Sequence, residues 1–387
     1  MTEQAKVPAI RFAGFTDPWE QRKLGDIAER VTRKNENNES DLPLTISAQH
    51  GLIDQRLFFN AQVASRDMSG YYLLRQGEFA YNKSTSADSP WGAIKRLTRY
   101  EKGCVSTLYI CFALLNANPD YLVTYYETNR WHKAVQMIAA EGARNHGLLN
   151  IAPDDFFDTM VSLPESQAEQ QTIGAFFSRL DSLITLHQRK YDKLVIFKKS
   201  MLEKMFPKDG ESVPEIRFAG FTDPWEQRKF SEIVDVCSGR DYKHLDEGPI
   251  PVYGTGGYMT SVSEALSHNR DAIGIGRKGT IDKPYLLKAP FWTVDTLFYA
   301  IPKSDINLEF ALCSFLNVDW KSKDESTGLP SLSKESINET VLSVPNVVEQ
   351  NHLGNFFADL DRLITLHQRK LELLQNIKKS LLDKMFV

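Results

Sequence analysis

The sequence LITLHQRK occurs twice in the chain, at residues 183–190 and again at residues 363–370. The similarity extends outward from both copies at a constant offset of 180, so that residues 173–206 match residues 353–386. A long match at a single offset indicates an internal duplication. The two copies are therefore expected to fold alike.

Apolar residues recur within each copy at alternating steps of four and three residues. This spacing is typical of a helix that packs along its length against another helix. A helix from Ser166 to Phe206 would be about 60 Å long, too long for one small domain to cover, so the two copies are expected to pack on each other. His187 and His367 hold equivalent positions, where a polar pair that fixes register is favoured over a metal site. The residues predicted on the packed seam include Phe177, Leu180, Ile184, His187, Tyr191, Leu194, Phe357, Leu360, Ile364, His367, Leu371 and Leu374.

Both helices have a start signal in the sequence. Ser166 is followed three residues later by Glu169, and Asn346 is followed at the same spacing by Glu349. This pattern predicts a capping side chain with a Glu that bonds back to the cap backbone. Pro207 is expected to stop the first helix because it cannot continue the hydrogen-bond ladder.

A second repeat precedes each helix. VPAIRFAGFTDPWEQRKL at residues 7–24 returns as VPEIRFAGFTDPWEQRKF at residues 213–230, with 16 of 18 positions identical, whereas the inserts that follow diverge strongly. The predicted organisation is a lead-in at 1–24, a domain at 25–163, a long helix at 164–206, a linker with the second lead-in at 207–230, a second domain at 231–344 and a second long helix at 345–387.

The two inserts are predicted to be mixed α/β domains of one shared fold, which makes the chain α+β with internal pseudo-two-fold symmetry. Short strand-like runs are separated by Gly, Pro, Asn and Ser turns. One helix is predicted after Asn118, with an apolar face formed by Leu122, Tyr126, Trp131, Val135 and Ile138. A weak match aligns Gly147-Leu148 with Gly328-Leu329.

The composition describes a soluble globular protein. Charged residues make up 25% of the 387 and apolar residues 42%, and no apolar run is long enough for a membrane span. The polar start of the chain argues against a secretory signal, and the four cysteines without C-x-x-C spacing indicate reduced thiols, so a cytoplasmic location is expected. A net charge of −4 means that any nucleic-acid binding must come from local basic patches.

No catalytic motif is present in the sequence. The segment 274–280, GIGRKGT, lacks the spacing of a phosphate-binding loop, and the histidines are scattered. We therefore expect no active site, no metal site and no cofactor bound by this chain.

The inserts do contain basic and aromatic residues in predicted loops. Arg and Asn side chains suit purine edges and Lys suits phosphates. For any single residue a solvated loop position is the favoured interpretation, and the recurrence at matched places of the duplicated frame supports DNA binding. The candidate DNA-binding residues are Asn82, Lys83, Ser84, Lys95, Arg96, Arg144, Asn145, His146, Arg240, Tyr242, Lys243, Arg277, Lys278, Thr280 and Lys283.

The whole pattern resembles a known family. RFAGFTDPWEQRKL, a variable domain and a long helix that ends KKSMLEKMF at 198–206 or KKSLLDKMF at 378–386 look like a specificity subunit of a type I restriction–modification system. The resemblance covers nearly the whole chain, and it implies that each variable domain is a target-recognition domain for one half of a split, asymmetric DNA site. It also implies that the two helices form an antiparallel coiled coil that sets the spacer.

The resemblance implies partners as well. Two methyltransferase subunits would dock on the helices and use S-adenosylmethionine, and restriction subunits would use ATP and Mg²⁺. The family places the loop corresponding to 276–280 near double-stranded DNA, and Asn82-Lys83-Ser84 is the candidate for the same place in the first domain.

Two alternatives remain at this stage. The chain could be a coiled-coil adaptor with two β-rich modules that bind proteins or glycans, or a lone DNA-binding regulator without methyltransferase partners. Salt-dependent affinity for DNA would separate the adaptor from both DNA-binding hypotheses, because phosphate contacts release counterions.

Overall fold

The computed structural model of the chain divides into two compact units. Unit 1 combines Met1–Leu186 with Leu371–Val387, and unit 2 is His187–Lys370. Each unit therefore contains one domain, part of the helix that follows it, and part of the helix from the other repeat. The residues that the structure describes are 7–47, 50–58, 65, 67–87, 89–139, 147–208 and 210–387.

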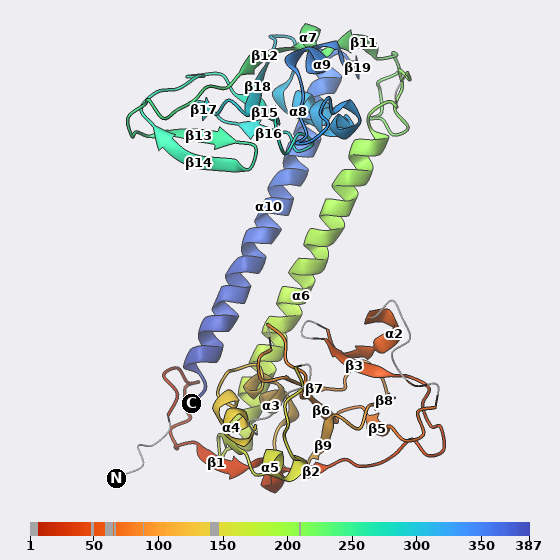
Figure 1. The fold of residues 1–387 in the computed structure, drawn as a ribbon, viewed down its shortest axis with the longest axis vertical. Helices are drawn as coiled ribbons and strands as arrows, with labels where there is room; N and C mark the ends of the chain where they lie inside the picture. The colour runs from red at the N-terminus through yellow and green to blue at the C-terminus, as the bar shows by residue number, and fades with distance from the viewer. Residues whose placement is uncertain are drawn as a thin grey trace. The chain divides into compact units, whose positions relative to one another are not determined.

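The domain of unit 1 is built from short strands and short helices (Figure 1). Its strands are β1 (Glu20–Lys23), β2 (Ala28–Arg30), β3 (Leu44–Ser47), β4 (Gly51–Asp54), β5 (Tyr72–Arg75), β6 (Phe79–Asn82), β7 (Ala93–Arg96), β8 (Lys102–Val105), β9 (Ile110–Leu114) and β10 (Met160–Leu163). Its helices are α1 (Leu24–Ile27), α2 (Gln55–Phe58), α3 (Pro119–Tyr125), α4 (His132–Ile138) and α5 (Pro153–Phe157).

A four-stranded antiparallel sheet in the order β2-β9-β6-β7 forms the centre of this domain. Its apolar face packs on the short helices: Tyr81 of β6 stacks on Phe156 of α5 with ring centroids 4.8 Å apart. Trp131 approaches the same Tyr81 edge-on at 6.1 Å. The core therefore lies between the sheet and α3–α5.

The single helix predicted after Asn118 is wrong, because the segment forms α3 and α4 with a turn between them. Asn118 caps α3 as expected, its side chain accepting from the backbone of Asp120 and Tyr121. The turn is held by Trp131, whose Nε1 donates to the Tyr126 carbonyl at 3.1 Å. The predicted apolar residues are still buried or half-buried, because the turn redirects the chain over the same core.

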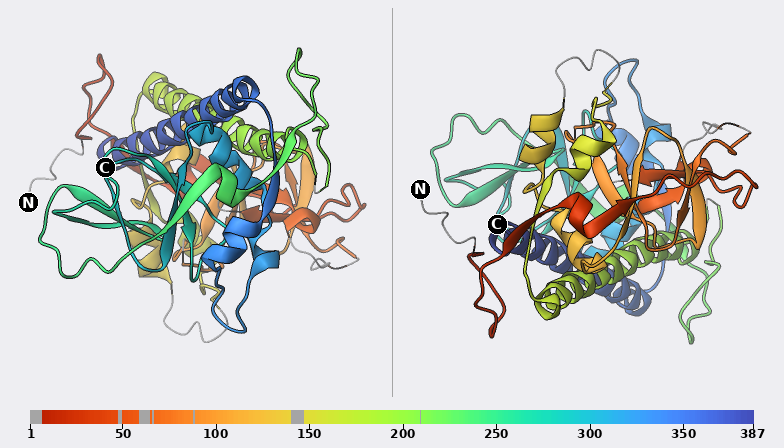
Figure 2. Two further views of the ribbon diagram at one scale, coloured as in Figure 1. Left: turned by 90° about the horizontal axis from the view of Figure 1, so that it is seen from above. Right: turned by 90° about the horizontal axis from the view of Figure 1, so that it is seen from below.

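Unit 2 repeats this arrangement with a different hairpin region (Figures 1 and 2). Its strands are β11 (Glu226–Lys229), β12 (Val234–Ser238), β13 (Ile250–Gly254), β14 (Gly257–Val262), β15 (Ala272–Gly276), β16 (Tyr285–Leu287), β17 (Trp292–Thr293), β18 (Leu297–Pro302) and β19 (Val341–Val344). Its helices are α7 (Phe230–Ile233), α8 (Leu308–Asn317), a 3₁₀ turn η1 (Trp320–Lys323) and α9 (Lys334–Glu339).

The central sheet of unit 2 has the order β12-β18-β15-β16, which corresponds to β2-β9-β6-β7 of unit 1. Trp320 repeats the role of Trp131, its Nε1 donating to the Phe315 carbonyl at 2.7 Å. A second sheet, β14-β13-β17, lies beyond the central one. The β3–β4 hairpin of unit 1 corresponds to the longer β13–β14 hairpin of unit 2, and the shared frame and this hairpin position the candidate site.

The two long helices are α6 (Gln167–Lys204) and α10 (Val347–Lys384), and each unit contains an antiparallel pair of their segments (Figure 1). In unit 1 the pair is tied by Lys378, whose Nζ lies 2.5 Å from the Asp181 carboxylate. The equivalent bond in unit 2 joins Lys198 to Asp361 at 2.6 Å. The same ion pair is therefore made twice, once in each unit.

The end of each helix completes the core of the domain beside it. In unit 1 Phe386 packs against Trp19 at 5.9 Å and Tyr121 at 5.6 Å between ring centroids. In unit 2 Phe206 stacks on Phe310 at 5.7 Å. Each domain is thus closed by an aromatic residue from the helix of the other repeat.

The capping prediction is half correct. Ser166 accepts from the Glu169 backbone at 3.4 Å, as a cap should. The Glu169 side chain does not bond back to the cap. It forms an ion pair with Arg11, which donates two hydrogen bonds to its carboxylate at 2.6 and 2.7 Å. Arg217 binds Glu349 in the same way at 2.7 and 2.8 Å. The lead-in repeat therefore fastens each domain to the start of its own helix.

Candidate nucleic-acid interface

The loop after β15 is held tightly by its own backbone. A Cβ on Gly276 would lie 2.0 Å from the Thr280 carbonyl oxygen, so only glycine allows the two strands of the loop to approach this closely. Gly279 has φ of 90°, the left-handed region that glycine tolerates best. The two glycines therefore shape a compact loop with little freedom to move.

This loop presents two cations to solvent. The Arg277 amide donates to the Thr296 carbonyl at 2.8 Å, which fixes the backbone beneath the exposed side chain. The Arg277 guanidinium reaches the Asp295 carbonyl only at 3.4 Å, so most of its donors are free. Lys278 is also exposed and makes no ion pair within the described ranges. Both side chains can therefore donate hydrogen bonds to phosphate or base acceptors without first breaking a strong existing bond.

Arg240 lies on the same edge of unit 2. Its amide donates to the Thr293 carbonyl at 2.9 Å, and its carbonyl accepts from Trp292 Nε1 at 2.9 Å. The segment from Thr293 to Thr296 therefore binds both backbones, since Thr293 accepts from the Arg240 amide and Thr296 accepts from the Arg277 amide. The structure therefore brings together two of the predicted arginines on one short segment, and both side chains are exposed.

The other candidates of unit 2 are less uniform. Tyr242 is half-buried and packs in the cluster beneath the hairpin, so its ring is partly structural. Lys243 is exposed one residue later. Lys283 is exposed beside Asp282, while Thr280 is half-buried at the base of the loop.

Asn82 is the last residue of β6, and Lys83 and Ser84 follow it as the loop of unit 2 follows β15. The Leu149 amide donates to the Lys83 carbonyl at 3.0 Å, and the Leu332 amide donates to the Arg277 carbonyl at the same distance. Ser84 and Lys278 then form equivalent isolated bridges. Lys83 therefore occupies the backbone position of Arg277.

These bonds correct the weak alignment of the two inserts. The Thr85 amide donates to the Gly147 carbonyl, whereas the Gly279 amide donates to the Pro330 carbonyl. Gly147 thus corresponds to Pro330 and not to Gly328. Glycine-leucine pairs occur by chance, and the hydrogen bonds identify the true equivalents.

Lys83 does not extend into solvent as Arg277 does. Its Nζ donates to the Ile151 carbonyl at 3.3 Å, and burial lowers the pKa of this half-buried ammonium. Asn82 is engaged as well, its Oδ1 accepting from the Ser84 amide at 3.0 Å. Asn82 and Lys83 are thus half-buried and each makes one hydrogen bond within unit 1, whereas Ser84 is exposed; their DNA contacts stay a prediction.

Lys95 and Arg96 lie in strand β7 and not in a loop. Arg96 donates to the Asp120 carboxylate at 2.6 Å, which ties the strand to the first turn of α3. Lys95 is half-buried and lies close enough to Asp181 to favour that residue's charged form. The structure therefore gives Arg96 a structural contact where a DNA contact was expected. Arg144, Asn145 and His146 lie outside the described residues.

The predicted seam residues follow the side of each helix that faces the paired segment. All twelve are buried or half-buried, while most of their neighbours along the helices are exposed: Phe177, Leu180, Ile184, His187, Tyr191, Leu194, Phe357, Leu360, Ile364, His367, Leu371 and Leu374. The seam is therefore occupied by contacts within the chain and is not open to a partner.

A second apolar line was missed by the sequence prediction. Leu183 and Leu186 are 46% and 47% exposed in unit 1, and the equivalent Leu363 and Leu366 are 42% and 58% exposed in unit 2. Four exposed leucines at equivalent repeat positions are unusual on a solvated helix. The repeated LITLHQRK motif could have indicated this exposed line, because its two leucines do not occupy the seam positions, which are those of Ile184 and His187.

The two seam histidines contact each other within unit 2. The Nδ1 atoms of His187 and His367 are 3.0 Å apart, and His187 is only 7% exposed. Burial lowers the pKa of His187, and the nearby charges of Lys370, His367 and Lys190 lower it further. One Nδ1 must accept the proton that the other donates, so the pair is stable when at least one ring is neutral.

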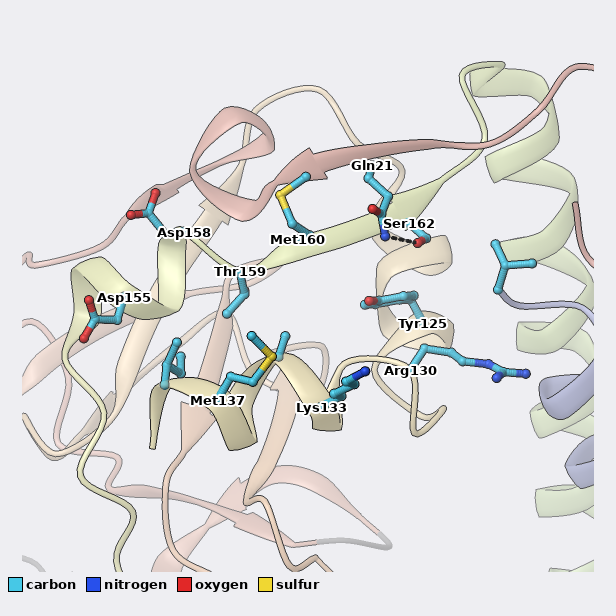
Figure 3. A pocket seen from close by; sticks show the side chains of 13 residues that line it. Gln21, Tyr125, Arg130, Lys133, Met137, Asp155, Asp158, Thr159, Met160 and Ser162 are labelled. Atoms are coloured by element: carbon cyan, nitrogen blue, oxygen red, sulfur yellow. Dashed lines mark hydrogen bonds between the residues drawn. The ribbon is translucent and has the colours of Figure 1, made fainter. Parts of the chain in front are cut away.

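Unit 1 also has a cavity of about 470 Å³ beneath β1 and β10 (Figure 3). Gln21 and Ser162 project into it and bond to each other at 3.4 Å. In unit 2 the equivalent Gln227 and Ser343 also bond to each other, at 2.7 Å, and both donate to the Glu211 carbonyl as well. Unit 2 has a cavity of about 500 Å³ at the corresponding place, lined by Gln227 and Ser343 and by linker residues such as Lys208.

The described residues also bear on metal binding and on thiol reactivity. Across the ranges that the structure describes, no group of three or more His, Cys, Asp or Glu is placed to hold a metal ion. Burial raises the pKa of Cys104 to about 11 and of Cys111 to about 12, which keeps both thiols protonated and unreactive. Within the same ranges no helix has the length and apolar character needed to cross a bilayer.

Three comparisons bear on this geometry. Residues 222–376 match the family model described as a type I restriction modification DNA specificity domain. A specificity subunit of the type I restriction enzyme MjaVIII from Methanocaldococcus jannaschii is 21% identical over 324 residues, which cover 73% of each chain.

Solved structures resemble the whole chain. The S subunit of a type I restriction–modification system from M. genitalium superposes with a TM-score of 0.63 at 17% identity, covering 98% of this chain and 99% of that one. A chain from a structure of type I system assembly and conformational transition gives a TM-score of 0.50 at 14% identity, covering 95% and 97%. These likenesses confirm the predicted α+β class with two domains.

Proposed function

Because the chain belongs to the family of type I restriction–modification specificity subunits, we propose that it selects the DNA site on which a methyltransferase complex acts. Each unit reads one half of a bipartite, asymmetric site in double-stranded DNA. The chain itself supplies no catalytic group and binds no cofactor.

The observation that carries this proposal is a loop frame built twice with different side chains. The Leu149–Lys83 and Leu332–Arg277 hydrogen bonds place the two loops alike, while the exposed residues on them differ. Arg277 offers the planar, two-pronged donor that suits guanine, and Lys278 offers a point charge that suits phosphate. A repeated frame with different contacts is what two unlike half-sites require.

The helices supply the remaining functions in this proposal. The exposed leucines at 183, 186, 363 and 366 fit two methyltransferase subunits, because equivalent apolar positions in a duplicated chain suit two copies of one partner. The paired helices set the spacer between half-sites. S-adenosylmethionine belongs to the methyltransferases, and ATP and Mg²⁺ belong to restriction subunits where these join in the cytoplasm. No observation favours the adaptor alternative.

Exchange of one domain tests the proposal. Replacing residues 231–344 with the equivalent segment of a relative should change one half of the modified site and leave the other half intact. The measurement is a map of methylated adenines in cells that also produce the methyltransferase. The matched exchange of residues 25–163 should change the opposite half, and a change of both halves by either exchange would contradict the two-reader arrangement.

A further inference from the structure

The hairpin of β13 and β14 has a stiff, apolar tip in unit 2. Tyr258 is 63% exposed and Met259 is 52% exposed, although both belong to a strand. Gly257, with φ of 104°, makes the turn, and a Cβ on Gly256 would meet nothing within 4 Å. The outer side of the tip is therefore open to a partner.

A β-bulge directs these side chains outward. The strand register shifts beside Tyr253, which pairs with Tyr258, while Val252 pairs with Thr260. Met259 is the extra residue, and its Sδ would lie 2.6 Å from a Cβ on Gly254. Gly254 leaves room for the Met259 side chain beside the bulge, and bulges of this kind often redirect a side chain next to a functional site.

A row of tyrosines supports the tip from behind. The ring of Tyr253 lies 6.3 Å from Tyr285 and 6.4 Å from Tyr258. Tyr285 Oη donates to the Gly254 carbonyl at 2.6 Å, which joins the hairpin to the neighbouring strand β16. Tyr258 is thus the exposed end of an anchored aromatic row, and ordering its ring on binding costs little further entropy.

The tip adjoins the basic loop described above. A Cβ on Gly279 would lie 4.0 Å from Thr255 Oγ1, in the turn of the hairpin. Arg277 and Lys278 precede Gly279 directly. An exposed aromatic ring and two exposed cations therefore occupy one continuous edge of unit 2.

We propose that Tyr258 is a wedge that enters the DNA duplex between two adjacent base pairs of the half-site read by unit 2. The idea rests on the proposed function and deepens it. Base faces are the large apolar surfaces of duplex DNA, and an inserted apolar side chain exchanges the stacking it disrupts for contact with its own ring. Arg277 contacts a base edge and Lys278 a phosphate beside the opened step, and the step bends away from the ring.

The test uses the full chain, in complex with its methyltransferase partner, on a duplex that carries the mapped site and a dye at each end. Wild type should shorten the distance between the dyes. Tyr258→Ala should abolish the bend and weaken binding about tenfold, the size expected for losing one aromatic–base contact. Tyr258→Phe keeps the ring and should retain both properties. A mismatch at the opened step should tighten binding of wild type more than that of Tyr258→Ala.

Other results overturn the idea. If Tyr258→Ala bound and bent the duplex as wild type does, a wedge would be excluded. A wild-type complex that left the duplex straight would also exclude it, even if Tyr258→Ala bound more weakly. Arg277→Ala separates this outcome from failure of the proposed function: it should weaken binding whether or not Tyr258 inserts. Because Tyr258 and Arg277 are both exposed, Tyr258→Ala and Arg277→Ala should each leave the thermal unfolding midpoint unchanged.

Discussion

The loops after β6 and β15 share two backbone hydrogen bonds and differ in the behaviour of their side chains. Lys83 turns inward to the Ile151 carbonyl, whereas Arg277 stands in solvent on an equivalent hydrogen bond. The frame is maintained by bonds that do not involve either side chain. Recognition can therefore change by substitution at a fixed position, without any change in the fold that presents it.

The lead-in ion pairs offer the strongest test of how alike the units are. Arg11→Met and Arg217→Met should each destabilise the protein by about 3 kcal/mol, because Glu169 and Glu349 are each 1% exposed and would lose their paired charge. The loss should be larger for Arg217→Met. Glu169 keeps a bond from Trp19 Nε1 at 3.4 Å, whereas Trp225 Nε1 has no partner in the described ranges.

Denaturant unfolding of each variant measures these effects. Lys23→Met is the control, since its ion pair with Asp158 is largely exposed and such pairs are worth about 1 kcal/mol or less. Equal losses for the control and the two lead-in variants would show that the buried pairs do not fasten the domains.

DNA affinity should separate the two loops. Arg277→Ala should cost about 1–3 kcal/mol on the mapped site if the guanidinium reads a base. Lys83→Ala should cost far less, because Lys83 is already engaged with its own unit. Titrations at several salt concentrations supply the measurement. Lys278→Ala should reduce the salt dependence of DNA affinity by about one released counterion. If Lys83→Ala weakened DNA binding as much as Arg277→Ala does, the contrast between the two loops would be wrong.

The histidine pair predicts the smallest effect. The pKa of His187 is lowered in the folded protein, so the unfolded chain binds a proton first as pH falls. Stability from this group is present above about pH 6.5, the usual His value, and is lost as pH falls below it, by about 1 kcal/mol or less. Unfolding free energies from pH 5 to 8 should show this slope, and it should shrink in His187→Gln. An unchanged slope in His187→Gln would assign the pH dependence to other groups.

The parts of the fold that repeat in sequence could be predicted, because identical residues at one offset must satisfy the same contacts twice. The seam spacing identified the side on which Phe177 and Phe357 are buried. The Asn118 cap was also recognisable from its local pattern.

Other features depend on contacts between residues far apart in the chain. No residue near Glu169 in the sequence indicates that the Glu169 carboxylate would pair with Arg11 instead of bonding back to the helix cap. Likewise the inward turn of Lys83 depends on the Ile151 carbonyl, and the engagement of Arg96 depends on Asp120. Sequence can identify a basic residue in a predicted loop, but only packing decides whether its charge is free.

The exchange of helix ends also has a consequence for the order in which the protein can be completed during synthesis. The aromatic residue that covers Trp19 and Tyr121 is Phe386, and the Ile10 amide bonds to the Lys384 carbonyl. About 200 residues separate the end of the first part of unit 1 from that covering segment, a delay of roughly 10–40 s at ribosomal rates. The domain made first is thus closed last, and its apolar surface stays accessible to chaperones, or to the same segment of a neighbouring chain, until Phe386 has been made.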